Sequence, residues 1–205
     1  MTVDRKRLFD LVLTVPVLVA SLPAQAVVAV LVRQRLGRPV LFKQVRPGLH
    51  GEPFEMVKFR TMLNPDPSAG LVSDEDRLTR LGRVLRATSL DELPSLWNIV
   101  KGDMSLVGPR PLLMRYLPRY TPEQARRHEV RPGLTGLAQV SGRNALTWEQ
   151  KFELDVAYVD RHTVLGDVKI LFATVGKVLR RDGIAAEDSA TMTEFMGSPA
   201  ARGAE

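Results

Sequence analysis

The feature that most restricts the fold of this sequence is a long apolar stretch near its N-terminus. Leu11 to Val32 is a run of 22 residues without one charged side chain. As a helix rising 1.5 Å per residue, it would reach roughly 33 Å, which is enough to cross the hydrocarbon core of a bilayer. This length predicts a membrane segment close to the start of the chain.

A secretory signal peptide is one alternative for this segment. Arg5-Lys6-Arg7 resembles the basic start of a signal peptide, and Ala24-Gln25-Ala26 resembles a cleavage site. The apolar run nevertheless continues past that site to Val32, which favours a segment that stays in the protein.

The charges on either side separate two retained forms, a straight span and a re-entrant helix. Basic flanks favour the cytoplasmic side of a membrane, and this segment has basic residues at both ends. A helix that enters the membrane, bends and returns places both ends on that side, and Pro16 and Pro23 can supply the bend. We therefore expect a re-entrant helix within residues 1–36, with an ordinary proline-kinked span as the alternative. The flanking residues are Arg5, Lys6, Arg7, Arg33, Arg35 and Arg38.

The rest of the composition limits the chemistry and the partners. The 205 residues suit one domain plus a membrane element. A formal charge of +6 is compatible with nucleic acid, anionic lipid headgroups or a phosphorylated substrate. The absence of cysteine excludes thiolate catalysis and cysteine-ligated zinc, and the three histidines are scattered, so any metal should have oxygen ligands.

Local patterns after the membrane segment predict a mostly α fold with a small β-hairpin. Strand-like runs on either side of Arg46-Pro47-Gly48 predict the hairpin within residues 39–62, and Asn64–Ser73 is typical of a surface loop. Apolar spacing predicts an amphipathic helix over Glu75–Thr88, whose arginine at every third position suits either a solvated face or a face among lipid headgroups.

Two further helices are predicted from capping residues. Thr147 and Gln150 form a capping-box pattern that opens a helix ending near His162. Asp167 suits the cap of a last helix over residues 168–181.

Shorter elements complete the expected organisation. Residues 122–129 suit a short helix, and Leu137–Val140 suits a short strand. The expected units are a re-entrant membrane helix over 1–36, a cytoplasmic or interfacial catalytic domain over 37–183, and a small, polar, mobile tail over 184–205.

The strongest candidate for a functional site is the adjacent acidic pair Asp91 and Glu92. A helix start explains the pair on local grounds, because Asp91 suits an N-cap, Glu92 the first turn and Pro94 an early helical position. The same residues can instead hold a divalent cation or supply a nucleophile, because an acid near a helix N-terminus stays ionised. Both interpretations remain open from the residues alone.

Arg110 stands between Pro109 and Pro111. This turn is either a solvated surface turn or a rigid mount that aims a guanidinium at phosphate oxygens. No Gly-x-x-x-x-Gly-Lys-Ser/Thr loop and no Gly-x-Gly-x-x-Gly motif is present, so neither a P-loop nucleotidase nor a dinucleotide fold is predicted. Other cations recur beside glycine and proline, which favours phosphate binding. They are Lys58, Arg60, Arg86, Arg131 and Arg143.

Nine short motifs follow one another along residues 5 to 182. They are Lys6–Asp10 (KRLFD), Arg46–Gly48 (RPG), Lys58–Met62 (KFRTM), Ser89–Leu93 (SLDEL), Lys101–Ser105 (KGDMS), Val107–Pro111 (VGPRP), Arg131–Gly136 (RPGLTG), Gly142–Asn144 (GRN) and Lys151–Val156 (KFELDV). A chain with these motifs in this order resembles the small monotopic phosphoglycosyl transferases of bacteria, the PglC type.

The resemblance implies a reaction. A sugar 1-phosphate would pass from a UDP-sugar to polyprenol (undecaprenyl) phosphate with release of UMP, as the first membrane step of glycoconjugate assembly. It also implies a monotopic membrane protein with interfacial amphipathic helices at the cytoplasmic face of the bacterial inner membrane. Sugar choice depends on pocket shape and a few hydrogen bonds, so no one sugar is predicted.

The resemblance also implies roles for the site residues. Asp91 would be the nucleophile of a covalent phosphosugar intermediate, and Glu92 would assist through Mg²⁺ or as a base, so both acids are expected metal ligands. Arg110 would hold a substrate phosphate. The other expected phosphate contacts are Lys58, Arg86, Arg131 and Arg143.

One departure from the family pattern concerns the membrane helix. The family places serine directly before the helix-breaking proline, whereas here Leu22 separates Ser21 from Pro23. Two other functions stay as alternatives to the transferase. One is a basic protein that binds a membrane surface or nucleic acid, for which interleaved aromatic residues are missing. The other is a metal-dependent phosphohydrolase, which would release sugar phosphate to water. The transferase needs no nucleic acid.

Overall fold

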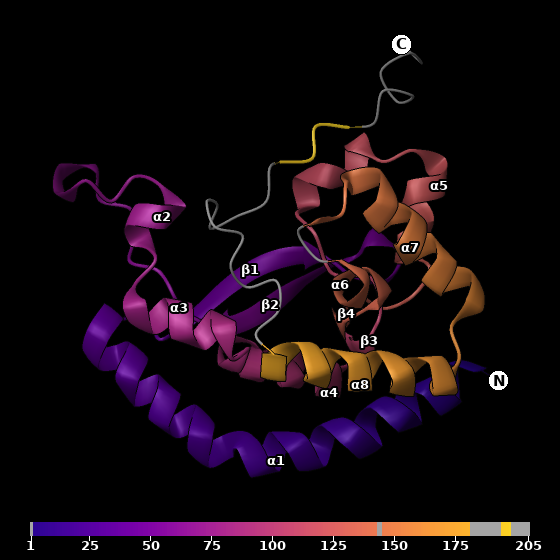
Figure 1. The fold of residues 1–205 in the computed structure, drawn as a ribbon, viewed down its shortest axis with the longest axis horizontal. Helices are drawn as coiled ribbons and strands as arrows, with labels where there is room; N and C mark the ends of the chain where they lie inside the picture. The colour runs from indigo at the N-terminus through magenta and orange to yellow at the C-terminus, as the bar shows by residue number, and fades with distance from the viewer. Residues whose placement is uncertain (1, 143–144, 181–193, 198–205) are drawn as a thin grey trace.

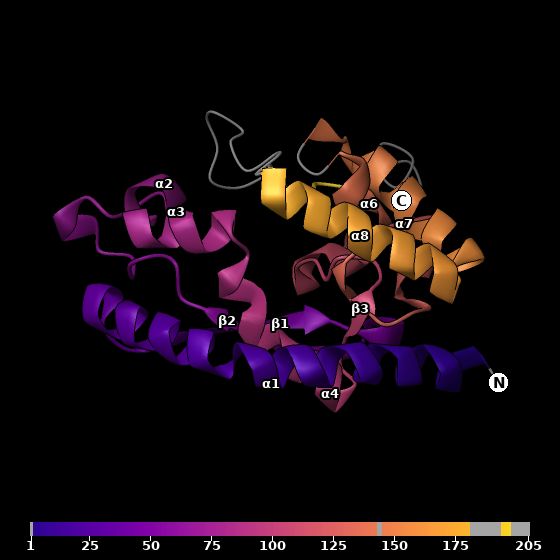
Figure 2. The same cartoon turned by 60° about the horizontal axis from the view of Figure 1, so that its bottom comes forward.

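The apolar stretch forms one continuous helix, α1 (Thr2–Leu36), in the computed structural model, which describes residues 2–142, 145–180 and 194–197. The helix runs through Pro16 and Pro23, each of which removes a backbone donor and favours a bend. Figure 1 shows a bow whose two ends both curve toward the other elements, and Figure 2 shows that it extends along most of the molecule. By length and composition, Arg5–Leu36 is the one helix among the described residues that can cross a membrane.

Short elements follow α1. The α-helices are α2 (Asp74–Arg77), α3 (Arg80–Ala87), α4 (Leu96–Lys101), α5 (Pro122–Ala125), α6 (Leu137–Ser141), α7 (Trp148–Arg161) and α8 (Val164–Arg180). The 3₁₀ helices are η1 (Leu49–Gly51), η2 (Pro67–Ala69), η3 (Leu90–Ser95), η4 (Met114–Arg119) and η5 (Arg126–His128). The strands are β1 (Leu41–Pro47), β2 (Pro53–Phe59), β3 (Ser105–Val107) and β4 (Gly133–Thr135). The predicted mostly α fold is confirmed, as are the surface loop at Asn64–Ser73 and the short helix at 122–129.

One face of α1 packs against the rest of the chain, and the opposite face is apolar and exposed. The buried stripe begins with Asp10, Thr14 and Leu18, four residues apart, and continues with Val28 and Val32. The helix is therefore a packed element on one side and an uncovered apolar surface on the other. The exposed residues include Leu8, Val12, Val15, Val17, Val19, Leu22, Val27 and Val30.

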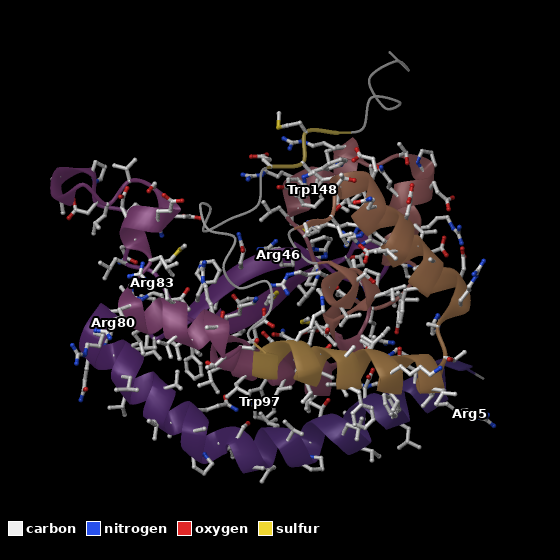
Figure 3. All side chains as sticks on the ribbon, in the orientation of Figure 1. Arg5, Arg46, Arg80, Arg83, Trp97 and Trp148 are labelled. Atoms are coloured by element: carbon white, nitrogen blue, oxygen red, sulfur yellow. The ribbon has the colours of Figure 1, made fainter. Side chains whose placement is uncertain are left out.

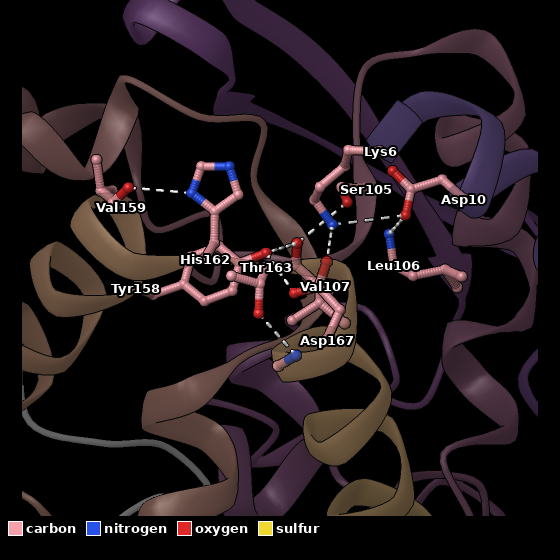
Figure 4. A network of polar contacts seen from close by, with 11 residues as sticks. Lys6, Asp10, Ser105, Leu106, Val107, Tyr158, Val159, His162, Thr163 and Asp167 are labelled. Carbon is pink, nitrogen blue, oxygen red and sulfur yellow. Dashed lines mark hydrogen bonds and ion pairs between the residues drawn. The ribbon is translucent and has the colours of Figure 1, made fainter. Parts of the chain in front are cut away.

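Lys6 and Asp10 fasten the N-terminal end of α1 to α8 and β3 (Figure 4). Lys6 Nζ lies 2.6 Å from Asp167 Oδ2, and Tyr158 OH donates to Asp167 Oδ1 over 2.8 Å. Asp10 Oδ1 accepts a hydrogen bond from Leu106 N over 3.2 Å. Lys6 and Asp10, which precede the apolar run, therefore bind α1 to the rest of the domain.

Arginines bind backbone carbonyls at both ends of α1. Near the start, Arg7 Nη2 donates to Val100 O over 2.7 Å, at the last turn of α4. Near the end, Arg60 donates to the carbonyls of Leu36 and Arg38, the latter over 3.1 Å. The last carbonyls of a helix lack intrahelical donors, so a guanidinium there satisfies them and suits the helix dipole. Both ends of α1 are thus bonded to the same body of the chain.

β1 and β2 form the predicted antiparallel hairpin. Arg46 lies opposite Phe54, and Phe42 lies opposite Lys58. Because opposite residues of an antiparallel pair point to the same face, this register places Arg46 and Lys58 on one side of the hairpin.

The predicted strand at Leu137–Val140 is wrong, because these residues belong to α6. A strand, β4, lies just before them and pairs in parallel with β3. A Cβ on Gly133 would lie 2.1 Å from Gly108 N, so only glycine permits this approach of the two backbones. Glycine at this position therefore lets β3 and β4 pair.

The predicted single helix Glu75–Thr88 is two helices. Ser73 and Thr79 each accept a hydrogen bond from a backbone N–H three residues later, so each caps a helix start. Between the two helices, Leu78 forms an isolated β-bridge with Met62. A tertiary contact and a second cap therefore interrupt a continuous helical pattern.

Caps account for the starts of the last two helices. Thr147 and Gln150 form the predicted capping box of α7. The prediction that Asp167 caps the last helix is wrong, because Thr163 Oγ1 accepts from Gly166 N over 3.0 Å at the start of α8. Asp167 is instead fully buried inside the first turn, where it binds α1 and α7.

A described part of the C-terminal segment, residues 194–197, packs on the domain. Phe195 is 2% exposed, and Glu194 Oε1 lies 2.8 Å from Arg119 Nη1. The prediction of a mobile tail is therefore wrong for these residues, because an aromatic side chain anchors them. The rings around Phe195 are Tyr116, Tyr120, Trp148 and Phe152.

Candidate active site

Asp91 and Glu92 lie in the first turn of η3, the 3₁₀ helix that leads into α4. The helix starts at Ser89, whose backbone is left-handed (φ 56°) and whose side chain makes no capping hydrogen bond. The prediction that Asp91 is the N-cap is therefore wrong, because the chain enters the helix before it. Within the described residues the Asp91 carboxylate has no hydrogen-bond partner, which leaves it available for chemistry.

Two buried polar side chains dock η3 and α4 on the open edge of β2. Ser95 Oγ donates to Val57 O over 2.7 Å. Asn98 accepts from Val57 N over 3.2 Å and donates to Glu55 O over 2.7 Å. Side chains thus pair a strand edge that the two-stranded sheet leaves free. Sequence analysis missed both residues, and their signal is a polar side chain inside the otherwise apolar run Leu93–Val100.

Two cations from other elements hold Glu92. Its Oε1 lies 2.6 Å from Lys58 Nζ on β2 and 3.0 Å from Arg110 Nη2 in the loop after β3. Burial alone would raise the pKa of Glu92, but the charges of Lys58 and Arg110 and their hydrogen bonds outweigh burial and lower it to about 2. Glu92 is therefore a permanent anion at neutral pH.

Asp91 has the opposite electrostatic character. It is buried, with 8% of its surface exposed. Burial raises the pKa of Asp91 to about 6, the charge of Glu92 acts in the same direction, and the charges of Lys58, Arg86 and Arg110 oppose the rise. At neutral pH this carboxylate is mostly ionised but poorly solvated, which is a state suited to a nucleophile.

Arg86 and Arg110 bring their charges to the acid pair from α3 and from the loop after β3. Arg86 Nε donates to Thr61 Oγ1 over 3.1 Å. The carbonyl of Arg110 accepts from Arg127 Nη2 over 2.8 Å, and Arg127 forms a buried ion pair with Asp155 at 2.7 Å. The proline-flanked turn is thus fixed from behind by Arg127, which sequence analysis missed.

The other predicted cations are engaged elsewhere or lie outside the described residues. Arg131 Nε donates to Gly102 O over 2.8 Å, at the end of α4, and makes no contact with the acid pair in the described part of the chain. Arg60 is buried at the end of α1, and Arg143 lies outside the described residues. The predicted cations that the structure gathers around the pair are Lys58, Arg86 and Arg110.

The acid pair fits a hard divalent cation such as Mg²⁺. Mg²⁺ commonly takes one or two carboxylates and completes its shell with water and substrate phosphates. Within the described residues no group of three or more His, Cys, Asp or Glu side chains could hold a metal, so an all-protein cage is not formed there. The Asp91 carboxylate has no hydrogen-bond partner among the described residues and is repelled by Glu92, so it is the ligand that a cation would stabilise most.

The arrangement suits reaction at a phosphorus atom. A carboxylate can approach a diphosphate only if cations neutralise the phosphate oxygens, and here Lys58, Arg86 and Arg110 surround the acids. The permanent anion Glu92 fixes two of these cations in place.

Comparison with known proteins relates the chain to bacterial transferases. A family model described as bacterial sugar transferase matches residues 2–181. The sequence is 56% identical over 194 residues to the uncharacterized sugar transferase EpsL of Bacillus subtilis, covering 94% of this chain and 96% of that protein.

Two relatives have names that state a reaction. UDP-glucose:undecaprenyl-phosphate glucose-1-phosphate transferase of Caulobacter vibrioides is 40% identical over 190 residues, covering 87% of this chain and 71% of that protein. Undecaprenyl-phosphate galactose phosphotransferase of Salmonella typhimurium is 40% identical over 196 residues, covering 87% of this chain and 41% of that protein. The chain thus spans nearly all of the Bacillus protein and less than half of the Salmonella protein.

Proposed function

Because the chain belongs to the bacterial sugar transferase family, we propose that it transfers a sugar 1-phosphate from a UDP-sugar to undecaprenyl phosphate and releases UMP. The predicted enzyme class, a sugar-phosphate transferase, is confirmed by the Caulobacter and Salmonella relatives. Their names support the donor and the acceptor, and they differ in the sugar, glucose in one and galactose in the other. The structural observation that carries the proposal is the buried acid pair Asp91 and Glu92 with cations around it.

The proposed reaction has two steps. An oxygen of the Asp91 carboxylate attacks the phosphorus that carries the sugar, and the bond from that phosphorus to the bridging oxygen of UMP breaks. UMP leaves with the electron pair of the broken bond. An oxygen of undecaprenyl phosphate then attacks the same phosphorus, and the bond to Asp91 breaks, which restores the carboxylate. A covalent step of this kind divides one difficult transfer into two easier ones.

The neighbours of Asp91 have separate roles in this scheme. Glu92 holds Lys58 and Arg110 and stays ionised, so it does not act as a proton donor at neutral pH. Arg110, half exposed, directs its guanidinium to the acid pair, where it can bind phosphate oxygens. Asp91 and Glu92 would hold Mg²⁺, which when bound supplies further positive charge to the diphosphate.

The proposed location is the cytoplasmic face of the bacterial inner membrane, in a monotopic arrangement. Lys6 and Asp10 bond one end of α1 to the domain and Arg60 bonds the other. An upright span fastened to one domain at both ends would draw that domain into hydrocarbon. A helix that dips into one leaflet with its exposed apolar face keeps the domain in water. On α8, Leu165 is 66% exposed and Phe172 is 75% exposed, which suits an interfacial helix.

Turnover in a lipid environment tests the proposal. The protein in nanodiscs is incubated with Mg²⁺, undecaprenyl phosphate and each of a panel of UDP-sugars, and UMP and lipid-linked product are measured. We expect both products with a matching donor, no turnover by Asp91→Asn, and normal turnover by Glu123→Gln, which changes an exposed carboxyl on α5. Free sugar phosphate in water without a lipid product would indicate a phosphohydrolase instead. Absence of UMP with every donor would contradict the proposal.

A further inference from the structure

Arg46, near the end of β1, is a partly buried arginine with no carboxylate within ion-pair distance in the described part of the chain. Its Nη2 donates to Gln44 Oε1 over 2.6 Å, and its Nη1 lies 3.5 Å from Pro111 O. Its Nε is buried and has no hydrogen-bond partner among the residues that the structure describes. The buried Arg127, by contrast, pairs with Asp155 at 2.7 Å. Of the five N–H donors of this guanidinium, two bond described residues, so Arg46 has further donors on its terminal nitrogens that this part of the chain leaves unused.

The charged groups near Arg46 are also arginines. Burial lowers the pKa of Arg46 to about 10, and the charges of Arg110 and Arg115 add to the lowering. Arg115 is partly neutralised by Glu194 Oε1, 3.0 Å from its Nε. Like charges held together repel one another unless an anion joins them. The arrangement around Arg46 therefore favours a bound anion.

Arg46 lies on the face of the hairpin that carries Lys58. Lys58 is opposite Phe42, and Arg46 is four residues beyond Phe42 on the same strand. At a rise of about 3.4 Å per residue, the two cations leave the strands about 14 Å apart. Arg110 lies between Lys58 and Arg46. It bonds Glu92, which also bonds Lys58, and its charge acts on Arg46. Cationic side chains therefore line this face of the hairpin, from the acid pair to the end of β1.

We propose that Arg46 and Arg110 form a second phosphate subsite beside the acid pair, which receives the phosphate of the nucleotide that leaves as UMP. The inference rests on the proposed function and deepens it. When the bond between the sugar-side phosphorus and the bridging oxygen breaks, the electron pair stays with UMP. Its phosphate gains about one negative charge, which guanidinium donors stabilise. Among the described residues the two terminal nitrogens of Arg46 bond only Pro111 O and Gln44 Oε1, so each keeps a further N–H group for this oxygen.

Both UMP and the acceptor lipid carry a phosphate monoester, so either could in principle bind this subsite. The position of the subsite distinguishes them. Figure 3 shows Arg46 well away from α1, the helix with the exposed apolar face suited to lipid. That position favours the water-soluble nucleotide over the lipid phosphate.

Three variants test the subsite. Arg46→Met removes the charge, Arg46→Lys keeps it without the planar fork, and Arg126→Met removes an arginine that already has carboxylate partners on α5 and α7. The KM values for UDP-sugar and undecaprenyl phosphate are measured, together with inhibition by UMP and by uridine. We expect Arg46→Met to weaken UDP-sugar and UMP about ten- to a hundredfold and to leave uridine inhibition unchanged. Arg46→Lys should lie between it and wild type, and Arg126→Met should match wild type.

Two results would overturn the assignment. Equal KM and inhibition constants in Arg46→Met and wild type would show that Arg46 does not form a phosphate subsite. A change confined to the KM for undecaprenyl phosphate would show that Arg46 binds the acceptor phosphate and not the nucleotide. If Arg46→Met does not fold, as judged by circular dichroism, Arg46→Lys decides the same comparison.

A binding measurement separates this inference from the proposed function. Titration calorimetry of UMP into each variant needs no turnover. If UMP binding depends on Arg46 but the protein turns over no UDP-sugar, the proposed subsite is supported and the proposed transferase activity is contradicted. If turnover is normal but UMP binding is independent of Arg46, the transferase activity is supported and the subsite is contradicted.

Discussion

At the scale of single residues, Asp91 and Glu92 show how two adjacent carboxyl groups come to differ. Glu92 bonds Lys58 and Arg110 directly, and its pKa falls to about 2. Asp91 is buried and bonds no cation in the described part of the chain, and burial raises its pKa to about 6. Pairs of acids whose surroundings separate their pKa values commonly divide the chemistry between them. Here Glu92 bonds the cations, which leaves Asp91 as the acid that the proposed reaction uses as nucleophile.

We expect Asp91→Asn to stabilise the fold at neutral pH while it removes activity. The pKa of Asp91 rises from its ordinary 3.8 to about 6 in the folded protein, so the ionised form disfavours the native state. This penalty is absent below the unfolded pKa, grows as the pH rises toward 6 and is complete above it, at a size of about 3 kcal/mol. Thermal unfolding at about pH 7.5 and about pH 4 measures the difference between variant and wild type at each pH. A variant no more stable than wild type at the higher pH would contradict the environment assigned to Asp91.

The rate of the first chemical step should depend on the same pKa. Only ionised Asp91 can attack phosphorus, so the rate should fall on the acid side with a midpoint no higher than about 6. Glu92, with a pKa of about 2, does not titrate in this range. Single-turnover UMP release measured against pH checks this expectation. A rate that rises as the pH falls would exclude the carboxylate nucleophile.

At the scale of elements, local signals predicted some structure and tertiary contacts decided the rest. The hairpin and the Thr147 capping box depend on neighbouring residues and could be predicted. The break at Leu78 depends on Met62, and the burial of Asp167 depends on Lys6, so neither could be predicted from local patterns.

The candidate site shows the same division. The acid pair and Arg110 could be selected from their motifs, because the resemblance named them. Arg46 belongs to the Arg46–Gly48 motif, but no role could be assigned to it from the sequence, and Asn98 could not be selected at all. The surroundings of Arg46 and the partners of Asn98 come from residues distant in the sequence.

Asn98 supports the element that carries the acid pair. We expect Asn98→Leu to lower the free energy of unfolding by about 2–4 kcal/mol, because Val57 N and Glu55 O lose their buried partner. Activity should fall as well, since η3 is displaced. Lys101→Leu, at a side chain 61% exposed on the same helix, should change stability by about 0.5 kcal/mol or less. Unfolding of both variants in matched detergent makes the comparison, and equal effects would show that the docking bonds are dispensable.

At the scale of the whole molecule, α1 and the domain act as one body. The helix is bonded at both ends and packed along one face, so in the proposed membrane arrangement its exposed apolar face would set how the domain lies on lipid. In that arrangement the acid pair would meet a soluble nucleotide and a lipid phosphate at the same surface.

Accessibility labelling tests this membrane arrangement. The sequence contains no cysteine, so single cysteines at Arg5 and Arg38 report the two ends of α1 without background. We expect a membrane-impermeant maleimide to label neither position from the outside of intact cells and both after lysis, because both ends stay with the domain. Labelling of one position from outside would indicate a straight span. A cysteine at exposed Glu123 on α5 is the control for the domain.

The measurement that tests the central claim most directly is the intact mass of the protein after incubation with UDP-sugars and Mg²⁺ in the absence of lipid acceptor. We predict an added sugar phosphate on the wild type, located on the peptide that contains Asp91, and no added mass on Asp91→Asn. Unmodified wild type that still forms lipid-linked product when acceptor is supplied would contradict the covalent role of Asp91, and so would an adduct that persists in the Asn variant.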